Sequence, residues 1–84
     1  MAKHVLTIGR IVHVTTPDGP RPAIVTRVHT KDAAGGGIVN VVAFEDTQAN
    51  EGVIRRTSVL YDPTGQILGS WHWPDEARPE EAQP

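Results

Sequence analysis

The sequence predicts a small all-β domain, built as a partly open, antiparallel five-stranded barrel of SH3-like or OB-like kind with an extended acidic C-terminal tail. Three observations support this fold class. Five short runs rich in β-branched residues alternate with turn-forming Gly, Pro and Asp. No window shows a helical period of convincing length. Two of the four aromatic side chains lie at strand spacing in Trp71-His72-Trp73, where they would share one face of a strand.

The first two predicted strands are joined by a tight turn. The run over residues 10–15 is rich in Val, Ile and Thr, which favour strands. Residues 17–20, Pro-Asp-Gly-Pro, form a turn because proline fixes φ and glycine accepts positive φ. The run over residues 23–30 alternates in polarity. This alternation predicts one face with Ile24, Thr26 and Val28, and an opposite face with Val25, Arg27 and His29.

The remaining strands follow a flexible connector over residues 31–37, which ends in three glycines. The run over residues 38–45 is apolar except for Asn40, which predicts a strand covered on both faces. The run over residues 53–61 alternates again, and residues 62–65, Asp-Pro-Thr-Gly, have the composition of a type I turn. A short last strand then carries the two tryptophans.

Length and composition predict one domain, residues 1–74, followed by a tail, residues 75–84. A chain of 84 residues buries only about 60–65% of its unfolded surface, so its core is thin. It has no cysteine, and therefore neither disulfides nor thiolate metal sites supplement that core. Oligomerisation is the remaining common device for a small scaffold, which predicts a homo-oligomer.

Charge and hydropathy exclude several partners. The tail carries four acidic residues and one arginine, a net −3, which leaves about +1 for the rest of a chain whose total is −2. A nucleic-acid-binding protein is expected to have a clear basic excess, so nucleic-acid binding ranks third, behind the two candidate functions given below. No stretch approaches the length of a membrane span, and no apolar signal segment follows residues 1–4. We therefore expect a soluble, intracellular protein.

Five blocks of the sequence carry a resemblance to known proteins. They are Gly9-Arg10-Ile11-Val12-His13, Arg21-Pro22-Ala23-Ile24-Val25-Thr26-Arg27-Val28, Val39-Asn40-Val41, Thr57-Ser58-Val59 with Tyr61-Asp62, and Trp71-His72-Trp73-Pro74. Together they resemble a family of small phage and prophage proteins of actinobacteria and proteobacteria. The last block is the most specific, although family members usually continue with Pro-Glu where this chain has Asp75. The resemblance implies a β-rich phage protein located in the host cytoplasm or, alternatively, in the virion. It implies no catalytic residues.

The tryptophan pair has two interpretations. Trp71 and Trp73 could form a stacking platform for a base, a sugar or a partner's proline, since aromatic faces bind such groups without sequence preference. Alternatively, they close one end of the barrel and shield the thin core. The scarcity of other large side chains favours the second interpretation.

The arginines suggest a second kind of site. Five of them lie in or beside predicted strands: Arg10, Arg21, Arg27, Arg55 and Arg56. Guanidinium groups bind phosphate and stack on aromatic rings, so a pocket for a phosphorylated small molecule forms if Arg27 and His29 share a face with the indoles. The predicted ligand-binding residues are Trp71, His72, Trp73, Arg21, Arg27 and His29. The alternative is ordinary strand arginines opposite Glu45, Asp46 or Glu51, which contribute little.

Metal binding and catalysis have weaker signals. No histidine has a second one within eight residues, and convergence of His13, His29 and His72 would depend on strand pairing. Ser58 or Ser70 with His72 and Asp62 could be nominated as a triad, but such combinations occur in most proteins. The triple glycine lacks the Lys-Ser/Thr of a P-loop. We expect neither a metal nor a cofactor, and no enzymatic activity.

The sequence therefore predicts a non-enzymatic binding module of phage type, with two candidate functions. In the first, the protein captures a nucleotide-derived small molecule and sequesters a host immune signal. In the second, it is a virion accessory protein, such as a capsid or tail component, whose partners are other phage proteins. Small barrels serve both purposes, so the fold class does not decide between them.

Overall fold

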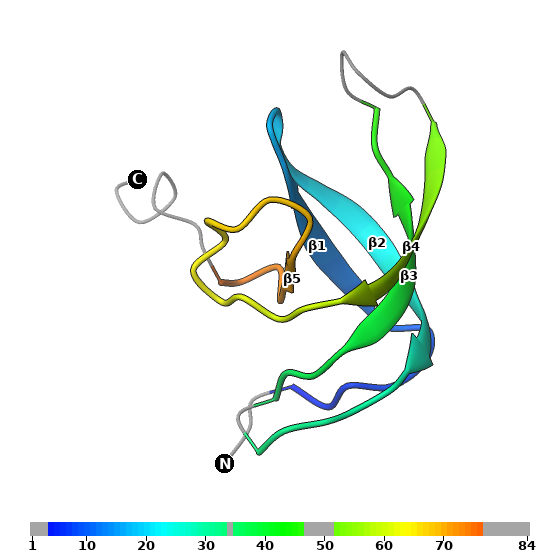
Figure 1. Cartoon of the computed structure of the whole chain (residues 1–84), viewed down its shortest axis with the longest axis vertical. Coiled ribbons are helices and arrows are strands. Elements are labelled where there is room, and N and C mark those ends of the chain that lie inside the picture. The colour runs from blue at the N-terminus through cyan, green and yellow to red at the C-terminus, as the bar shows by residue number, and fades with distance from the viewer. Residues whose placement is uncertain (1–3, 34, 47–51, 77–84) are drawn as a thin grey trace.

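The computed structural model describes residues 4–33, 35–46 and 52–76, and these residues form one antiparallel sheet without helices. Its five strands, in chain order, are β1 (Ile11–Thr16), β2 (Gly19–Val28), β3 (Val39–Phe44), β4 (Val53–Val59) and β5 (Trp71–His72). Their order in the sheet is β4-β3-β2-β1-β5, so the last strand returns beside the first (Figure 1). The structure confirms the all-β class and the five predicted strands.

The β1–β2 hairpin is longer than the sequence predicts, because β2 begins at Gly19 and includes two prolines. Thr16 pairs with Gly19, which leaves a two-residue loop, and Gly19 has a φ of 108°. The Thr16 hydroxyl donates to the Gly19 carbonyl at 2.6 Å. Pro20 and Pro22 precede Ala23, the first β2 residue paired with β3, so their missing N–H groups interrupt no bond to that strand.

Two bulges change which face some side chains occupy. The first lies in β2, where the register shifts between Val25 and Arg27 and Thr26 becomes the extra residue. As a result Val28 packs against the same core as Val25. The predicted alternation over residues 23–30 is therefore wrong beyond Val25, because one extra residue reverses every later side chain.

The second bulge lies in β4, where two residues oppose Asn40 of β3. Ser58 has a φ of 52°, the one positive value among the described non-glycine residues. The Asn40 amide oxygen accepts a hydrogen bond from the Ser58 backbone N–H at 2.9 Å. The Asn40 side chain therefore stabilises a backbone conformation of Ser58 that serine rarely adopts.

The core consists of small aliphatic side chains from the inner face of the sheet, together with the two indoles. Its members are Leu6, Val12, Val14, Ala23, Val25, Val39, Val41, Ala43, Val59, Trp71 and Trp73. On the outer face of β3, Val42 is half-buried and Phe44 is exposed. The prediction that both faces of β3 are covered is therefore wrong, and the apolar run continues onto an open face.

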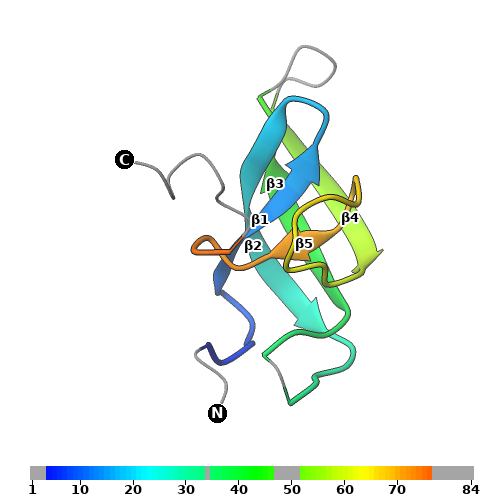
Figure 2. The ribbon, with the colours of Figure 1, turned by 90° about the vertical axis from the view of Figure 1, so that its left-hand side faces the viewer.

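The sheet curls so that β5 meets the chain just after β4 (Figures 1 and 2). Trp71 N donates to Leu60 O and Asp62 N donates to Trp71 O, each at 2.9 Å, and together they form an isolated parallel bridge at Tyr61. Along the rest of β4 no strand of the described chain lies on this side. The sheet is thus joined at one point, and the predicted barrel is only partly closed.

The predicted boundary at residue 74 does not separate the domain from all of the tail. Glu76 bonds to Tyr61, and Asp75 bonds to His4, so the first two tail residues contact the domain. The rest of the predicted tail, residues 77–84, lies outside the described residues. No helix long and apolar enough to span a membrane occurs in the described part of the chain.

Candidate functional site

The two indoles belong to the core and present no face for stacking a ligand. Trp71 and Trp73 are 0% and 1% exposed. Their rings meet edge to face, with centroids 5.3 Å apart and planes at 84°. Each ring N–H is satisfied, since Trp71 Nε1 donates to Gly37 O at 2.9 Å and Trp73 Nε1 donates to Gly35 O at 2.8 Å. Of the two interpretations, the structure supports closure of the core.

The triple glycine lets the backbone pass close enough to accept these bonds. The Tyr61 ring lies 4.7 Å from the Trp71 ring and covers Gly36 so closely that a Cβ there would overlap it. A Cβ on Gly37 would overlap the Thr30 carbonyl, and the φ of Gly37 is 151°. Bulky residues at either position would separate the connector from the indoles. The glycines therefore serve close approach.

The segment before β1 covers the remaining face of Trp73. The His4 ring stacks on the indole with centroids 4.3 Å apart, and the Arg10 guanidinium carbon lies 5.3 Å from the ring centroid. His4 Nε2 also donates to the Asp75 carboxylate at 2.9 Å. These contacts tie the N-terminal segment to the beginning of the predicted tail.

We call the region formed by residues 35–37, Tyr61, Trp71 and Trp73 the indole end. Glu76 bonds to two of these residues. Its carboxylate accepts from the Tyr61 hydroxyl at 2.7 Å and from the Trp73 backbone N–H at 2.8 Å. Burial, and secondly this bond to Glu76, raise the pKa of Tyr61 well above its usual value. The phenol therefore stays protonated and donates.

His72, which lies between the two tryptophans, is buried on the opposite side of β5 from the indoles. It pairs with His13 across β1 and β5, with ring centroids 5.8 Å apart and planes at 85°. Neither ring nitrogen of His72 has a hydrogen-bond partner within the described residues. Burial, and secondly the neighbouring His13, lower the pKa of His72 below its usual value, so the imidazole is neutral near pH 7.

The other three predicted ligand residues lie elsewhere. Arg27 is exposed after the β2 bulge, and Arg21 is half-buried opposite Val14 with its Nε lacking a partner in the described chain. Asn40 Oδ1 accepts a hydrogen bond from the Ser58 N–H and is therefore an acceptor. His29 Nε2 donates to the same oxygen at 2.9 Å. Among the described residues, no hydrogen bond or ring contact joins Arg21, Arg27 or His29 to the Trp71-His72-Trp73 segment. The six residues do not form one site.

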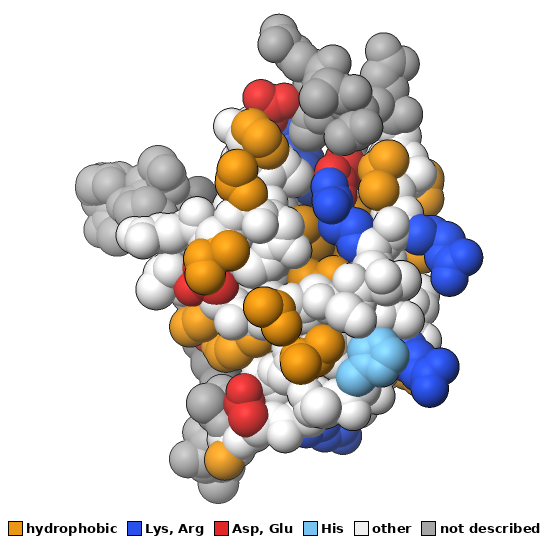
Figure 3. Space-filling view, viewed as in Figure 1, with side chains coloured by type: hydrophobic (Ala, Val, Ile, Leu, Met, Phe, Trp, Pro, Cys, Tyr) orange, Lys and Arg blue, Asp and Glu red, His pale blue; other side chains and the backbone are white. Residues whose placement is uncertain are grey.

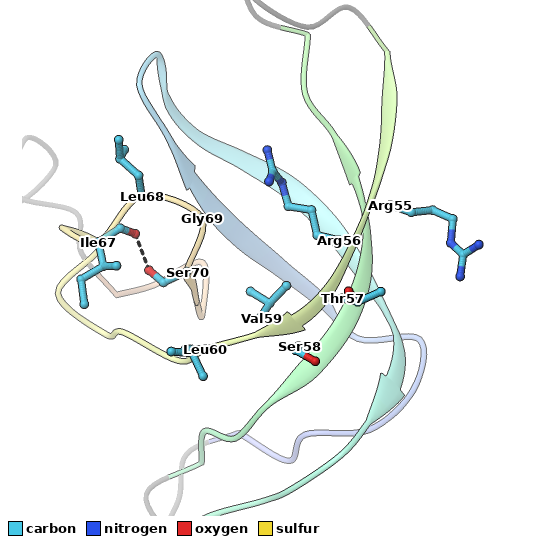
Figure 4. A pocket seen from close by; sticks show the side chains of 10 residues that line it. All are labelled: Arg55, Arg56, Thr57, Ser58, Val59, Leu60, Ile67, Leu68, Gly69 and Ser70. Carbon is cyan, nitrogen blue, oxygen red and sulfur yellow. Dashed lines mark hydrogen bonds between the residues drawn. The ribbon is translucent and has the colours of Figure 1, made fainter.

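A hollow opens instead where β4 diverges from the segment 67–70, and we call it the seam hollow. Its volume is about 260 Å³. It is lined by Arg55, Arg56, Thr57, Ser58, Val59, Leu60, Ile67, Leu68, Gly69 and Ser70. Figure 4 shows Arg56 and Val59 directed into the space between the two segments, and Arg55 directed away from it. Figure 3 shows the same side of the molecule, where basic and acidic side chains lie next to one another with apolar side chains around them.

The charge inside the seam hollow is compensated. Arg56 forms a bidentate pair with Glu45, through its Nε to one carboxylate oxygen and its Nη2 to the other, the latter at 2.8 Å. The Glu45 side chain is 1% exposed, whereas that of Arg56 is 33% exposed. The bond to Glu45 raises the pKa of Arg56. The hollow therefore presents no uncompensated cation from Arg56.

The wall opposite β4 is fixed by the buried carboxylate of Asp62. It accepts hydrogen bonds from the Thr64 N–H and hydroxyl, the Gln66 N–H and the Ile67 N–H, at 2.6–3.0 Å. These bonds, the Thr64 hydroxyl first, lower the pKa of Asp62 to about 2. The Ser70 hydroxyl donates to Ile67 O at 2.6 Å. The loop is thus held in place by its own bonds.

Sequence reasoning missed the seam hollow. The available signals were the apolar pair Ile67-Leu68 within a turn-rich segment and the adjacent Arg55 and Arg56. Leu60, Ile67 and Leu68 are 58%, 61% and 61% exposed. The alternative interpretation of the arginines, pairing with acidic residues of a neighbouring strand, describes Arg56 correctly. It did not anticipate that the partner, Glu45, is buried.

The comparisons with known proteins add no relative. The chain matches no protein family, no curated protein and no solved structure at a significant level. Within residues 4–33, 35–46 and 52–76, no group of three or more His, Asp or Glu side chains is arranged to hold a metal ion. The functional argument therefore depends on the geometry of the chain itself.

Proposed function

We propose that the protein is a non-enzymatic binding module that acts through contacts with other proteins at the seam hollow. The observation that carries this proposal is the exposure of three large aliphatic side chains, Leu60, Ile67 and Leu68, beside a concave surface. Exposed apolar side chains that line one concave surface are typical of protein-binding sites. In the phage setting that the sequence resemblance implies, this function corresponds to the virion accessory role, as a capsid or tail component.

Capture of a nucleotide-derived small molecule is the alternative, and it has less support. The volume of the seam hollow, about 260 Å³, is below the range of roughly 300–1,000 Å³ that is typical of ligand pockets. Arg56 is already neutralised by Glu45 and would have to release it to bind a phosphate. Of the residues predicted for capture, Trp71, His72 and Trp73 are buried, whereas Arg21 is half-buried and Arg27 and His29 are exposed.

Selection from a displayed library of random peptides tests the proposed function. We expect the wild-type protein to enrich peptides whose binding is lost in the Leu60→Ser/Leu68→Ser variant. The matched control is Val5→Ser/Ile8→Ser, which removes two equally exposed aliphatic side chains outside the seam hollow. The control should bind the enriched peptides as the wild type does.

Two results would contradict this function. One is a selection that enriches no peptide above background. The other is enrichment of peptides that bind the Leu60→Ser/Leu68→Ser variant undiminished. A thermal-shift panel of cyclic nucleotides and ADP-ribose derivatives tests the alternative, because a ligand that binds only the native state must raise the melting temperature. We expect no rise with any of them.

The homo-oligomer predicted from the small core has a candidate surface on the outer face of the sheet. Phe44 of β3 and Val53 of β4 pair directly and are both exposed, and Ile11 of β1 is exposed as well. Sedimentation of the wild type and of Phe44→Ser tests whether this face joins copies. A wild-type monomer at the highest soluble concentration would reject the oligomer.

A further inference from the structure

We propose that the partner at the seam hollow is an extended peptide segment that adds to the free edge of β4 and carries an acidic residue between two apolar ones. This inference rests on the proposed function and specifies the shape and chemistry of the partner. It follows from three features of β4: its place in the sheet, the direction of its backbone groups and its charge.

β4 is the last strand of the sheet on one side, so one of its edges has no strand beside it in the described chain. The register fixes which residues point to that edge. Glu45 N bonds to Gly52 O, so the alternating pairs Ala43↔Ile54 and Val41↔Arg56 use their backbone groups towards β3. The N–H and C=O groups of Val53 and Arg55 therefore point to the open edge. Such an edge is a template for an additional strand.

A strand added here would direct alternate side chains to the two faces of the sheet. A residue opposite Arg55 would lie on the outer face, next to the guanidinium that points away from the hollow (Figure 4). The residues before and after it would point inward, into the seam hollow, beside the Arg56 stem, Val59 and Leu68. These neighbours are apolar or offer methylene groups, so aliphatic residues fit the two inward positions.

Charge selects the residue between them. β4 contains two arginines and no acidic residue, and Arg55, unlike Arg56, forms no ion pair within the described residues. Antiparallel pairing of two β4 strands from two copies would bring arginines of both copies together, which is unfavourable. Glutamate or aspartate opposite Arg55 is favourable. The structure therefore favours an acidic partner strand over a second copy.

The test uses the peptide Ac-Ser-Thr-Leu-Glu-Leu-Thr-Ser-amide and amide chemical-shift mapping on the whole isotope-labelled protein. We expect saturable shifts at the amides of Val53 and Arg55. Replacing the peptide's Glu by Lys should weaken binding by about fivefold, the size expected for exchanging one cross-strand attraction for a repulsion. In Arg55→Glu protein the preference should reverse, and the Lys peptide should bind better.

Backbone pairing has its own control. In the proposed register the N–H of the peptide's Glu faces β4, whereas the N–H groups of the two Leu residues face away. N-methylation at Glu should weaken binding by about tenfold, since it removes one backbone hydrogen bond and places a methyl group against the edge. N-methylation at the first Leu should leave affinity nearly unchanged. Equal effects of the two modifications would overturn strand addition.

The failure of this inference can be told apart from the failure of the proposed function. Peptides that need Leu60 and Leu68 but respond neither to N-methylation at the central residue nor to the charge at position 55 would retain protein binding at the hollow and overturn the added strand. No shift at Val53 or Arg55 at millimolar peptide would also overturn it. Dimerisation through β4, detected by intermolecular contacts between β4 amides, would replace the acidic partner by a second copy.

Discussion

The indole end and the seam hollow both lie where the curled sheet closes on itself. Large apolar side chains are buried at the indole end and exposed at the seam hollow. At the indole end both tryptophans are buried and each ring N–H is bonded to a glycine carbonyl. At the seam hollow, Leu60, Ile67 and Leu68 remain exposed although the loop that carries two of them is firmly bonded. In so small a domain the largest side chains are needed for the core. The two tryptophans therefore stabilise the fold, and ordinary aliphatic residues mark the candidate site.

The largest expected effect is loss of an indole at the closed end. Trp71→Ala should lower the free energy of unfolding by about 3–5 kcal/mol, because it removes a fully buried aromatic side chain and leaves a cavity. Chemical denaturation followed by circular dichroism measures the change. Leu68→Ala, at the open seam, is the control and should change stability by less than about 0.5 kcal/mol. Similar losses for the two variants would erase the contrast between the regions.

The next effect concerns the ion pair in the seam hollow. Arg56→Met leaves the Glu45 carboxylate buried without its partner. We expect a loss of about 2–3 kcal/mol, less than the roughly 3–5 kcal/mol of a fully buried pair because Arg56 is 33% exposed. The double variant Glu45→Leu/Arg56→Met should recover most of this loss when unfolding is measured in urea. A double variant as unstable as Arg56→Met would show that the lost interaction is not the unpaired charge.

A smaller effect is expected from the glycine beneath Tyr61. Gly36→Ala places a methyl group against the ring and should cost about 1–3 kcal/mol through overpacking. Tyr61→Ala removes that ring, so the methyl group should cost much less in the Gly36→Ala/Tyr61→Ala protein. A double-mutant cycle measures this coupling. Strictly additive effects would mean that the close approach of Gly36 to Tyr61 is not what requires glycine.

The smallest effect is a pH dependence at His72. Its pKa is lowered in the folded protein, so the unfolded chain binds the proton more readily and stability falls as pH drops below about 6.5 towards the folded value. The slope from this one group cannot exceed about 1.4 kcal/mol per pH unit. His13 lowers the pKa further, whereas Glu76 and Asp62 oppose the shift. Urea unfolding from pH 7.5 to 5 should show a reduced slope in His72→Phe.

A histidine at the surface supplies the comparison for this measurement. His29→Gln leaves His72 and His13 in place, so the part of the acid-side slope that His72→Phe removes should be retained. Asp62 does not interfere, because its pKa of about 2 places its own acid-side loss of stability below pH 4. If His72→Phe kept the full slope, the imidazole would not be the group responsible.

The strands could be predicted from the sequence because their signals are local. β-branched runs separated by Gly- and Pro-rich turns predict that the five strands exist, although β2 begins at Gly19, inside the predicted turn. The bulges at Thr26 and Ser58 could not be predicted, because each depends on the residue opposite it in another strand. Because of the extra residue in β2, Val28 lies on the core face and not on the face that sequence alternation predicts.

The candidate site was harder to predict for the same reason. The seam hollow exists because β4 and the segment 67–70 diverge after a single bridge, a feature of three-dimensional closure rather than of local pattern. The bulge in β2 puts Arg27 on the face opposite Val25, and β1 separates β2 from β5, so sequence alternation does not bring Arg27 and His29 to the indoles. By contrast, the scarcity of other large side chains favours a core role for the indoles over a stacking platform, and their burial agrees with that role.

Both tryptophans of the chain are buried at the indole end, so tryptophan fluorescence reports on the state of this region. Their fluorescence should be blue-shifted in the native state and should move to longer wavelength when the indole end opens to water. Since no indole lines the seam hollow, occupancy there should leave the emission maximum nearly constant. An emission maximum that does not move when a partner binds would therefore indicate that the partner contacts the seam hollow and not the indole end.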